Sequence, residues 1–278
     1  MGGLVWIASY PKSGNTWTRN FLHNLLRPGE DTQNINKMHQ LTTYEIAGHW
    51  YDGLVGKPIE ECSTEDIAKV RMQAQQRIAN DTDGLVFVKT HNALVRDHGV
   101  SLINTAITAG AIYVVRNPLD VAISYSHHLN ATIDVTIERM NQPGVHTNNH
   151  KNVVYEVVGS WTQNVHSWTR REHQALHIMR YEDMLADPEK TFGKLCEFLL
   201  LQPKRAELLG AIEKSSFNRL KEQEDKEGFH EKPKDAKRFF REGRAGVWKE
   251  HLSEEQVRNI VAANREQMKR FGYVPEGF

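Results

Sequence analysis

The sequence predicts an α/β fold: a single domain, residues 1–278, with a central parallel β-sheet flanked by α-helices. Two observations predict this class. Short apolar segments alternate along the chain with segments of helical periodicity, and such alternation produces a parallel sheet covered on both faces. No stretch has the composition of a linker, and 278 residues are enough for one substantial core. Functional groups are therefore expected at the C-terminal ends of the strands.

The predicted strands are short, apolar or β-branched, and bounded by turn residues. They are Leu4–Ser9, Leu85–Lys89, Ala111–Arg116 and Leu176–Met179. Helical periodicity predicts the helices Thr16–Leu26, Asp66–Ala79, Pro118–His128, Val153–Arg170, Pro188–Leu200 and Ser253–Phe271. Asn117 is expected to cap the third of these, and Ser253 with Gln256 forms a capping box at the last. The polar segments Asn130–Asn152 and Lys221–Arg244 are predicted as irregular loops of the kind that form lids or binding sites.

The composition excludes several classes of protein. Lys plus Arg number 35 and Asp plus Glu number 35, so the chain offers no global field for nucleic acid or an anionic membrane, and any anion site must be local. Cys62 and Cys196 are the only cysteines, too few for a disulfide framework and wrongly spaced for a zinc site, which favours a reducing cytoplasm. We expect no signal peptide and no membrane span, because no apolar run has the required length.

A small-residue loop, residues 11–16, follows the first predicted strand. A strand, such a loop and a helix in this order commonly bind phosphate, because the helix N-terminus offers unpaired N–H groups and the positive end of its dipole. Backbone N–H groups and the hydroxyls of Ser13 and Thr16 would surround the phosphate, while Lys12 reaches the bond to be broken. In the nucleotide loop GxxxxGK[ST] the lysine follows the second glycine, whereas Lys12 precedes the only one, Gly14. The alternative is a solvated turn.

Lys89 and His91 lie at the end of the second predicted strand. The two-residue alternation of a strand places both side chains on one side. A histidine within hydrogen-bond reach of an acceptor hydroxyl can remove its proton near neutral pH, so His91 is a candidate general base. A surface or structurally bonded histidine is the alternative, as for any of the 14 histidines.

Arg116 and Ser124 suggest a second anion site. Arg116 ends the third predicted strand, and Ser124 lies two helical turns further along, so that both can grip one phosphate. A second phosphate site implies a nucleotide phosphorylated at two positions. Alternatively, Arg116 pairs with Asp120 and Ser124 is simply exposed. Near the C-terminus, residues 239–249 combine glycines, arginines and a lysine, which indicates either a basic flap over an anionic nucleotide or a solvated charged turn.

In their order, these stretches resemble the cytosolic (sulfotransferase domain 1) type of sulfotransferase, which uses 3′-phosphoadenosine 5′-phosphosulfate (PAPS). The family's PKSGTTW loop appears as PKSGNTW at residues 11–17, its arginine-to-serine segment as RNPLDVAIS at 116–124, and its RKGxxGxWK segment as REGRAGVWK at 241–249. KTH at 89–91 and RYEDM at 180–184 also fall where the family places them. The resemblance spans nearly the whole chain. It implies a fold related to the P-loop kinases, in a bacterial-like enzyme of small-molecule metabolism.

The resemblance also implies roles for single residues. The 5′-phosphosulfate and adenine would be bound by Lys12, Ser13, Gly14, Asn15, Thr16 and Trp17, and the 3′-phosphate by Arg116, Ser124, Arg241 and Gly243. The adenosine pocket would be completed by Tyr181, Ser215, Ser216 and Phe217. In catalysis, Lys12 would neutralise the leaving phosphate oxygen, Lys89 would stabilise the sulfuryl oxygens and His91 would be the base. Ser124 would hold Lys12 away from the donor until the acceptor arrives.

The chain departs from the family pattern at three places. Glu242 occupies a donor-site position where the family has lysine, which weakens the positive field of the flap unless Arg244 substitutes. Asn15 replaces a threonine but keeps a hydrogen-bonding side chain. The KxxxTVxxxE dimer pattern is not evident after Lys249, so both a monomer and a homodimer stay open.

The implied reaction is sulfuryl transfer from PAPS to a hydroxyl or amine of a small-molecule acceptor, with release of adenosine 3′,5′-bisphosphate (PAP) and without a metal. A kinase of this fold would need the GxxxxGK[ST] loop and a magnesium ligand, which are not evident, and a nucleotide-sensing module would not need Lys89 and His91. The acceptor pocket is expected in residues 35–55 and 127–150, which contain Trp50, Tyr51, His39, His49, His127 and His128. The alternative is that these side chains are simply exposed on the surface. Steroid, phenol, polyketide, peptide antibiotic, alkaloid and lipid acceptors all stay open.

Overall fold

The structure, a computed structural model, describes residues 2–27, 29, 34–232 and 238–278. The strands are β1 (Leu4–Ser9), β2 (Thr42–Tyr44), β3 (Val86–Thr90), β4 (Arg96–Asp97), β5 (Val100–Ser101), β6 (Thr108–Val115) and β7 (Leu176–Arg180). The helices are α1 (Asn15–Leu26), α2 (Thr64–Asn80), α3 (Pro118–Leu129), α4 (Ile133–Asn141), α5 (Trp161–Thr169), α6 (Tyr181–Ala186), α7 (Pro188–Phe198), α8 (Arg205–Lys214), α9 (Phe217–Glu227), α10 (Trp248–His251) and α11 (Glu254–Arg270). Short 3₁₀ turns span Ile35–Gln40, Gly48–Tyr51, Ile59–Glu61 and Thr105–Ile107.

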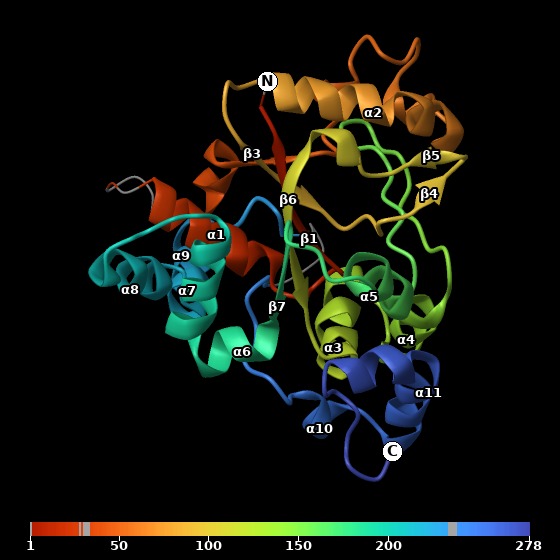
Figure 1. Cartoon of the computed structure of the whole chain (residues 1–278). Coiled ribbons are helices and arrows are strands. Elements are labelled where there is room, and N and C mark those ends of the chain that lie inside the picture. Colours follow the sequence, from red (N-terminus) through yellow and green to blue (C-terminus); the bar gives the residue numbers. More distant parts are fainter. Residues whose placement is uncertain (1, 28, 30–33, 233–237) are drawn as a thin grey trace. The chain divides into compact units, whose positions relative to one another are not determined.

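A five-stranded sheet has the order β2-β3-β1-β6-β7, and β4 and β5 form a separate antiparallel hairpin (Figure 1). β1 runs parallel to β3 in a register from Leu4 opposite Val86 to Ala8 opposite Thr90, and β2 also runs parallel to β3. All six residues of β1 are buried, as expected for a strand covered on both faces. The predicted α/β class with a central parallel sheet is confirmed.

The chain divides into two compact units. Unit 1 comprises Met1–Pro11, Thr42–Tyr113 and Arg139–Ile178, and unit 2 comprises Lys12–Leu41, Val114–Glu138 and Met179–Phe278. One boundary falls in the loop after β1, between Pro11 and Lys12, and another falls within β6. The prediction that residues 1–278 form one domain stays a prediction.

In unit 1, buried polar side chains fix α2 and α5. Gln75 of α2 donates to the carbonyl of Leu102 at 2.7 Å, and the hydroxyl of Tyr113 in β6 donates to Asn164 of α5 at 2.8 Å. A capping box formed by Ser160 begins α5. Because α5 is tied to a central strand in this way, its inward-facing side chains have fixed positions.

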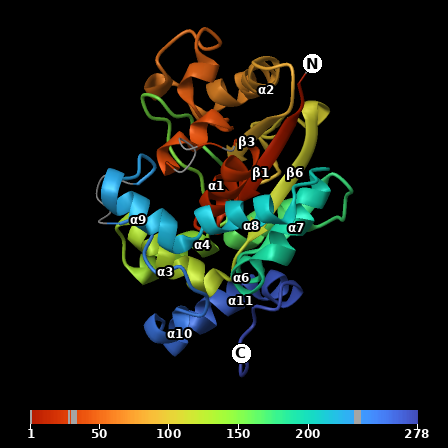
Figure 2. The same cartoon turned by 90° about the vertical axis from the view of Figure 1, so that its left-hand side faces the viewer.

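In unit 2, α1 packs against α8, and α8 packs against α7 and α9 (Figure 2). Phe21 of α1 stacks on Phe192 of α7, with ring centroids 4.1 Å apart. Arg19, fully buried on α1, donates to the two carboxylate oxygens of Glu231 at 2.9 and 3.0 Å. Asn117 caps α3, as predicted, by accepting an N–H of its first turn.

The predicted helix Val153–Arg170 is wrong in its first half, because α5 begins only at Trp161. The chain before it forms isolated antiparallel bridges, including one between His146 and Val157, and Gly159 has a left-handed φ of 68°. The apolar spacing continues through this extended stretch and hides the capping box. The other predicted helices and strands are confirmed to within a few residues at each end.

Both segments predicted as irregular contain a helix. Asn130–Asn152 includes α4, and Lys221–Arg244 includes most of α9. Residues 233–237 of the second segment lie outside the described residues. The short strand β2, which sits at the sheet edge, was not predicted, since three residues carry too little pattern to be recognised.

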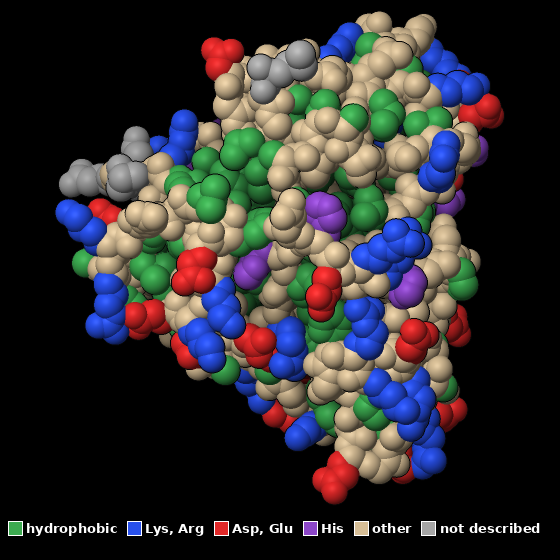
Figure 3. Space-filling view, in the orientation of Figure 1, with side chains coloured by type: hydrophobic (Ala, Val, Ile, Leu, Met, Phe, Trp, Pro, Cys, Tyr) green, Lys and Arg blue, Asp and Glu red, His purple; other side chains and the backbone are tan. Residues whose placement is uncertain are grey.

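The surface carries charges of both signs. Figure 3 shows Lys and Arg side chains interspersed with Asp and Glu side chains on one face, which agrees with the formal net charge of zero. Among the helices of the described residues, none is long and apolar enough to cross a membrane.

Candidate active site

The loop between β1 and α1 has the features of an anion site. Lys12 and Gly14 have left-handed φ angles of 65° and 111°, which turn the chain sharply before the helix. Gly14 is the N-cap of α1, and no side chain forms a capping hydrogen bond at this helix N-terminus. The fully buried hydroxyl of Ser13 has no hydrogen-bond partner among the described residues. Since buried hydroxyls normally have partners, a phosphate oxygen would complete this site.

Arg116 and Tyr181 form one side of this loop. The Arg116 guanidinium donates to the carbonyl of Lys12 at 3.1 Å and lies 4.2 Å from the centroid of the Tyr181 ring. That ring approaches Gly14 so closely that an added Cβ would lie 2.9 Å from it. The same ring lies edge-on to Trp17 at 5.7 Å between centroids. Predicted donor residues that are far apart in the sequence therefore meet within unit 2.

The other predicted residues of the loop and of α3 have intermediate or low exposure. Asn15 is buried, while Thr16 and Trp17 are half-buried in the first turn of α1. Ser124 is half-buried on α3, and its hydroxyl forms no hydrogen bond within the described chain. Ser124 thus has a hydroxyl available to a ligand, as its predicted role requires.

The Lys12 ammonium lies over the ring of Phe239, 3.7 Å from its centroid. Phe239 and Phe240 precede the glycine-rich segment 241–247 and pack with Phe217 in a hydrophobic cluster. Glu224 of α9 accepts the N–H groups of Phe239 and Phe240 at 2.6 and 2.9 Å. The loop lysine is therefore joined by a cation–π contact to the segment that was predicted to be the flap.

Gly243 lies against the ring of Phe217. A Cβ at this position would lie 2.2 Å from the ring, and the φ angle of Gly243 is 63°, so that only glycine fits. This contact joins two motifs that were assigned to the donor. Ser215 is buried and donates to the carbonyl of Ile212 at 3.1 Å, whereas Ser216 is the N-cap of α9 without a side-chain hydrogen bond. The hydroxyl of Ser215 therefore supports the end of α8.

Arg244 of the flap is paired with two carboxylates. It donates to Glu250 at 2.6 Å and to Glu242 at 3.3 Å, so its charge is already partly offset. Arg241 is exposed and forms no ion pair with any described residue. Of the two arginines, Arg241 is the one that can meet a phosphate. Glu242 is exposed and forms an ion pair with Arg244.

Asp120 fixes the flap, a role that the sequence did not reveal. Its buried carboxylate accepts the N–H of Gly246 at 2.8 Å and the N–H of Trp248 at 3.0 Å. In the sequence, Asp120 was interpreted as an alternative partner of Arg116. The two backbone bonds tie α3, which begins after Arg116, to the segment that carries Arg241.

The ring of His91, in unit 1, has a defined tautomer. Its Nδ1 lies 2.8 Å from the carbonyl oxygen of Ser9, and because a carbonyl only accepts, Nδ1 is the donor. The lone pair of the neutral ring is therefore on Nε2. The main chain of His91 is held as well, since its N–H donates to Glu156 Oε1 at 2.6 Å and its carbonyl accepts from Asn164 at 3.0 Å. At the end of β3, His91 thus has one defined nitrogen, Nε2, that can accept a proton.

Lys89 lies two residues before His91, also in unit 1. Its Cα is paired with that of Tyr44 in the sheet, and its Nζ lies 5.0 Å from the centroid of the Tyr44 ring. Glu156 is 6% exposed and interacts electrostatically with Lys89. Burial raises the pKa of the Glu156 carboxyl, while the Lys89 ammonium and the His91 N–H act to lower it. Lys89 and His91, the two residues predicted for catalysis in unit 1, therefore share an acidic neighbour, Glu156, that no sequence pattern indicated.

The residues proposed from sequence for the acceptor pocket are not all accessible. Tyr51 is fully buried in a hydrophobic cluster, its hydroxyl donates to Glu45, and its pKa is raised by burial, so it belongs to the core. Trp50 is half-buried and donates to Thr43 at 3.2 Å. Of the four histidines proposed for this pocket, His128 is half-buried, whereas His39, His49 and His127 are exposed.

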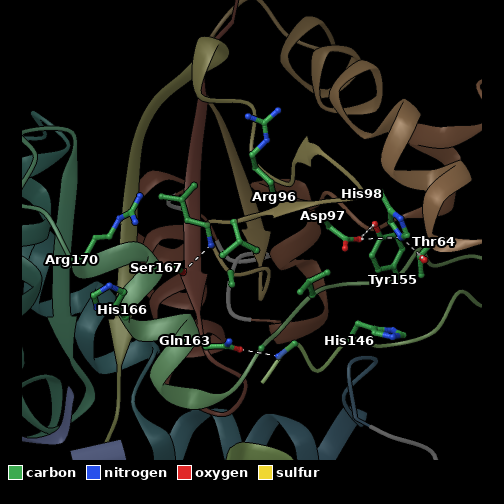
Figure 4. Close-up of a pocket in the computed structure, with 16 residues that line it drawn as sticks. Thr64, Arg96, Asp97, His98, His146, Tyr155, Gln163, His166, Ser167 and Arg170 are labelled. Atoms are coloured by element: carbon green, nitrogen blue, oxygen red, sulfur yellow. Dashed lines mark hydrogen bonds and ion pairs between the residues drawn. The ribbon is translucent and has the colours of Figure 1, made fainter. Parts of the chain in front are cut away.

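Unit 1 also contains a cavity of about 620 Å³ between the β4–β5 hairpin and α5 (Figure 4). Its lining includes Tyr155, His98 and His166, but neither Lys89 nor His91. Tyr155 donates to Asp97 at 2.6 Å on its wall. The predicted base, His91, therefore does not line this cavity. Among the described residues, no group of three or more His, Cys, Asp or Glu side chains is placed to hold a metal ion.

The comparisons with known proteins decide the family. The model of the sulfotransferase domain matches residues 3–272. The chain belongs to the sulfotransferase family. The family predicted from the PKSGNTW, RNPLDVAIS and REGRAGVWK segments is therefore confirmed.

Relatives of the chain are named after different acceptors. The chain is 30% identical over 176 residues to the 3-alpha-hydroxysteroid sulfotransferase of Cavia porcellus, an alignment that covers 61% of this chain and 59% of the relative. It is 26% identical over 297 residues to the flavonol 3-sulfotransferase of Flaveria bidentis, covering 97% of this chain and 83% of the relative. The chain thus spans less than two thirds of the guinea-pig enzyme but most of the plant enzyme.

Solved structures share the sulfotransferase fold. Retinol dehydratase in a complex with retinol and PAP aligns with a TM-score of 0.67 and 20% identity, covering 96% of this chain and 81% of that one. Mouse sulfotransferase SULT7A1 complexed with PAP aligns with a TM-score of 0.62 and 20% identity, covering 96% and 85%. At this identity the likeness concerns the fold.

Proposed function

We propose that the protein transfers the sulfuryl group of PAPS to a hydroxyl or amine of a small-molecule acceptor and releases PAP. The observation that carries this proposal is the start of α1, where the buried Ser13 hydroxyl lacks a partner among the described residues and the helix N-terminus has no side-chain cap. Such a site is prepared for an anion. Membership of the sulfotransferase family makes the 5′-phosphosulfate of PAPS the candidate.

The donor is held by unit 2 in this proposal. The loop Lys12–Trp17 takes the 5′-phosphosulfate, and the cationic Arg116 with the available hydroxyl of Ser124 takes the 3′-phosphate. Tyr181, Trp17 and Phe217 supply aromatic surface for the adenine. Arg241 and the main chain at Gly243 complete the 3′-phosphate site, because Arg244 is already paired.

His91 is the general base of the proposed reaction. Its Nε2 takes the proton of the acceptor while the acceptor oxygen or nitrogen attacks sulfur, and the bond between sulfur and the bridging phosphate oxygen breaks. The electron pair of that bond stays on the 5′-phosphate of PAP. Proton loss and bond formation therefore balance without an oxidant or a metal.

Two lysines stabilise the charge that develops. Lys12 neutralises the phosphate oxygen that leaves, and Lys89 neutralises the sulfuryl oxygens. Preorganised donors of this kind each contribute on the order of a hundredfold in rate. Ser124 is proposed to restrain Lys12 until the acceptor binds. A cytoplasmic location, and a monomer or homodimer as the assembled state, complete the proposal.

Binding measurements test the donor class. Isothermal titration with PAP should give a single site, whereas ATP should bind much more weakly, because it lacks the 3′-phosphate that Arg116 and Ser124 are proposed to hold. Equal affinities for PAP and ATP would favour a kinase. Turnover of labelled PAPS with an acceptor panel then separates an enzyme from a nucleotide-sensing module.

The variant His91→Ala tests the base. Transfer should be lost while PAP affinity is unchanged, because His91 is assigned to the acceptor proton and not to the donor. His173→Ala removes an exposed histidine of the same unit and serves as the control. Near wild-type transfer by His91→Ala would contradict the assignment.

A further inference from the structure

Glu156 is a buried carboxylate next to the two proposed catalytic residues of unit 1. Its Oε1 accepts the main-chain N–H of His91 at 2.6 Å, and its own N–H donates to the Thr147 hydroxyl at 2.8 Å. Only 6% of its surface is exposed. The side chain therefore reaches the catalytic turn from a segment that lies 65 residues away in the sequence.

A buried charge at this place calls for a physical reason. An amide or hydroxyl oxygen could accept the His91 N–H equally well, and burying a carboxylate costs several kcal/mol unless charges compensate it. The compensating cation on β3 is Lys89, which acts on Glu156 more strongly than any other charge. Glu156 thus interacts with both residues: it accepts the main-chain N–H of the proposed base and interacts electrostatically with the lysine that is assigned to the sulfuryl oxygens.

Two other charged residues that act on Glu156, Glu45 and Arg71, pair with each other. Glu45 and Arg71 form a fully buried ion pair at 2.8 Å, and Glu45 also accepts from the side chain of Asn92. Glu45 acts to raise the pKa of Glu156 and Arg71 acts to lower it, so that these two neighbours oppose each other. Lys89 and the His91 N–H both act to lower the pKa of the Glu156 carboxyl.

We propose that Glu156 is a positioning residue for sulfuryl transfer: it fixes the main chain of His91, and its charge stabilises both the Lys89 ammonium and the imidazolium that forms when His91 accepts the acceptor's proton. This inference rests on the proposed function. It assigns a role to a residue that belongs to none of the recognised motifs.

The chemistry follows from the charges. In the ground state the His91 ring is neutral, with Nε2 as the base. When the acceptor proton arrives on Nε2, a positive charge forms in a half-buried ring, and a nearby carboxylate makes that charge less costly. The same carboxylate keeps Lys89 protonated in a partly desolvated site. Glu156 therefore acts on the reaction without touching either substrate.

Three variants distinguish the effect of the Glu156 charge from the effect of its hydrogen bond to the His91 main chain. Glu156→Gln keeps an oxygen that can accept the His91 N–H but removes the charge, whereas Glu156→Asp keeps the charge on a shorter side chain. Thr147→Val removes the acceptor of the Glu156 N–H and leaves the carboxylate intact, so it serves as the matched control. Thermal unfolding of each variant establishes that it is folded.

The first readout is the pH dependence of kcat/KM for the acceptor. Glu156→Gln should lower kcat about tenfold or more and move the acid limb, which reports the base, to lower pH by about half a unit or more. Glu156→Asp should restore part of both effects, and Thr147→Val should leave the position of the acid limb unchanged. PAP affinity should stay at the wild-type value in all three.

The second readout needs no activity. Nuclear magnetic resonance titration of the His91 ring gives its pKa directly, and Glu156→Gln should lower this pKa relative to wild type and to Thr147→Val. Equal His91 pKa values in wild type and Glu156→Gln would overturn the proposal, even if activity falls. If wild type transfers no sulfuryl group, the proposed function fails, while the titration still decides whether the Glu156 charge acts on His91.

Discussion

Replacing His23 with leucine should make the protein more resistant to mild acid. His23 lies on α1, is fully buried, and neither ring nitrogen has a hydrogen-bond partner among the described residues. Burial, together with the charges of Arg27 and His39, lowers the pKa of His23 from 6.5 to about 4. The folded protein therefore keeps this ring neutral under conditions in which the unfolded chain binds a proton.

The magnitude follows from proton linkage. Between pH 6.5 and about 4 the unfolded state holds one proton more than the folded state at this position, so the free energy of unfolding falls as the pH falls through this window. The loss between pH 8 and pH 5 is about 2 kcal/mol from this one group. Below pH 4 both states are protonated and the loss levels off.

Urea denaturation followed by tryptophan fluorescence at pH 8, 6 and 5 measures this effect. Wild type should lose about 2 kcal/mol more between pH 8 and pH 5 than His23→Leu. His251→Leu, which removes an exposed histidine of unit 2, should keep the wild-type slope. Identical slopes for wild type and His23→Leu would refute the reasoning, as would a directly measured His23 pKa near 6.5.

The remaining predictions concern the donor site and the core. Arg116→Ala should raise the donor KM tenfold or more with little change in the acceptor KM, because charge-assisted hydrogen bonds contribute about 1.5–3 kcal/mol; steady-state kinetics with both substrates varied would expose an equal rise. Asp120→Ala should weaken PAP binding about tenfold in calorimetry by freeing two backbone N–H groups of the flap, whereas Asp134→Ala, which removes an exposed carboxylate on α4, should not. Glu45→Ala should lower the free energy of unfolding by about 3–5 kcal/mol in denaturant, since it leaves Arg71 buried without its carboxylate; a loss below about 1 kcal/mol would contradict the importance of this ion pair.

Local sequence patterns were enough to predict many of the residues that are proposed to bind the donor. β1 is an apolar run that ends before Pro11, and the turn residues that follow constrain the start of α1. The capping residue Asn117 and the alternation of Lys89 with His91 are likewise properties of a few neighbouring residues. Such features need no knowledge of what packs against them, so β1, the cap of α3 and the motif residues could be predicted from the sequence.

Other parts depended on contacts that no local pattern contains. The start of α5 was missed because the apolar spacing before Trp161 is compatible with a helix, while the tertiary bridges of Val153 and Val157 make that stretch extended. The role of Asp120 was missed for the same reason, since its partners lie more than 120 residues away. In both cases a long-range backbone hydrogen bond overrides the local preference.

Glu156 shows why the family motifs alone do not describe the surroundings of Lys89 and His91 completely. The KTH stretch supplies a lysine and a histidine, but their protonation states depend on charges that the rest of unit 1 brings to them. The carbonyl of Ser9 fixes which nitrogen of His91 carries the proton, and Glu156 accepts the His91 main-chain N–H and interacts electrostatically with Lys89. If Glu156→Gln shifts the His91 titration as proposed, the basicity of His91 is set by a segment outside the motifs. Differences in optimal pH between enzymes with the same KTH stretch should then follow the residue at this position.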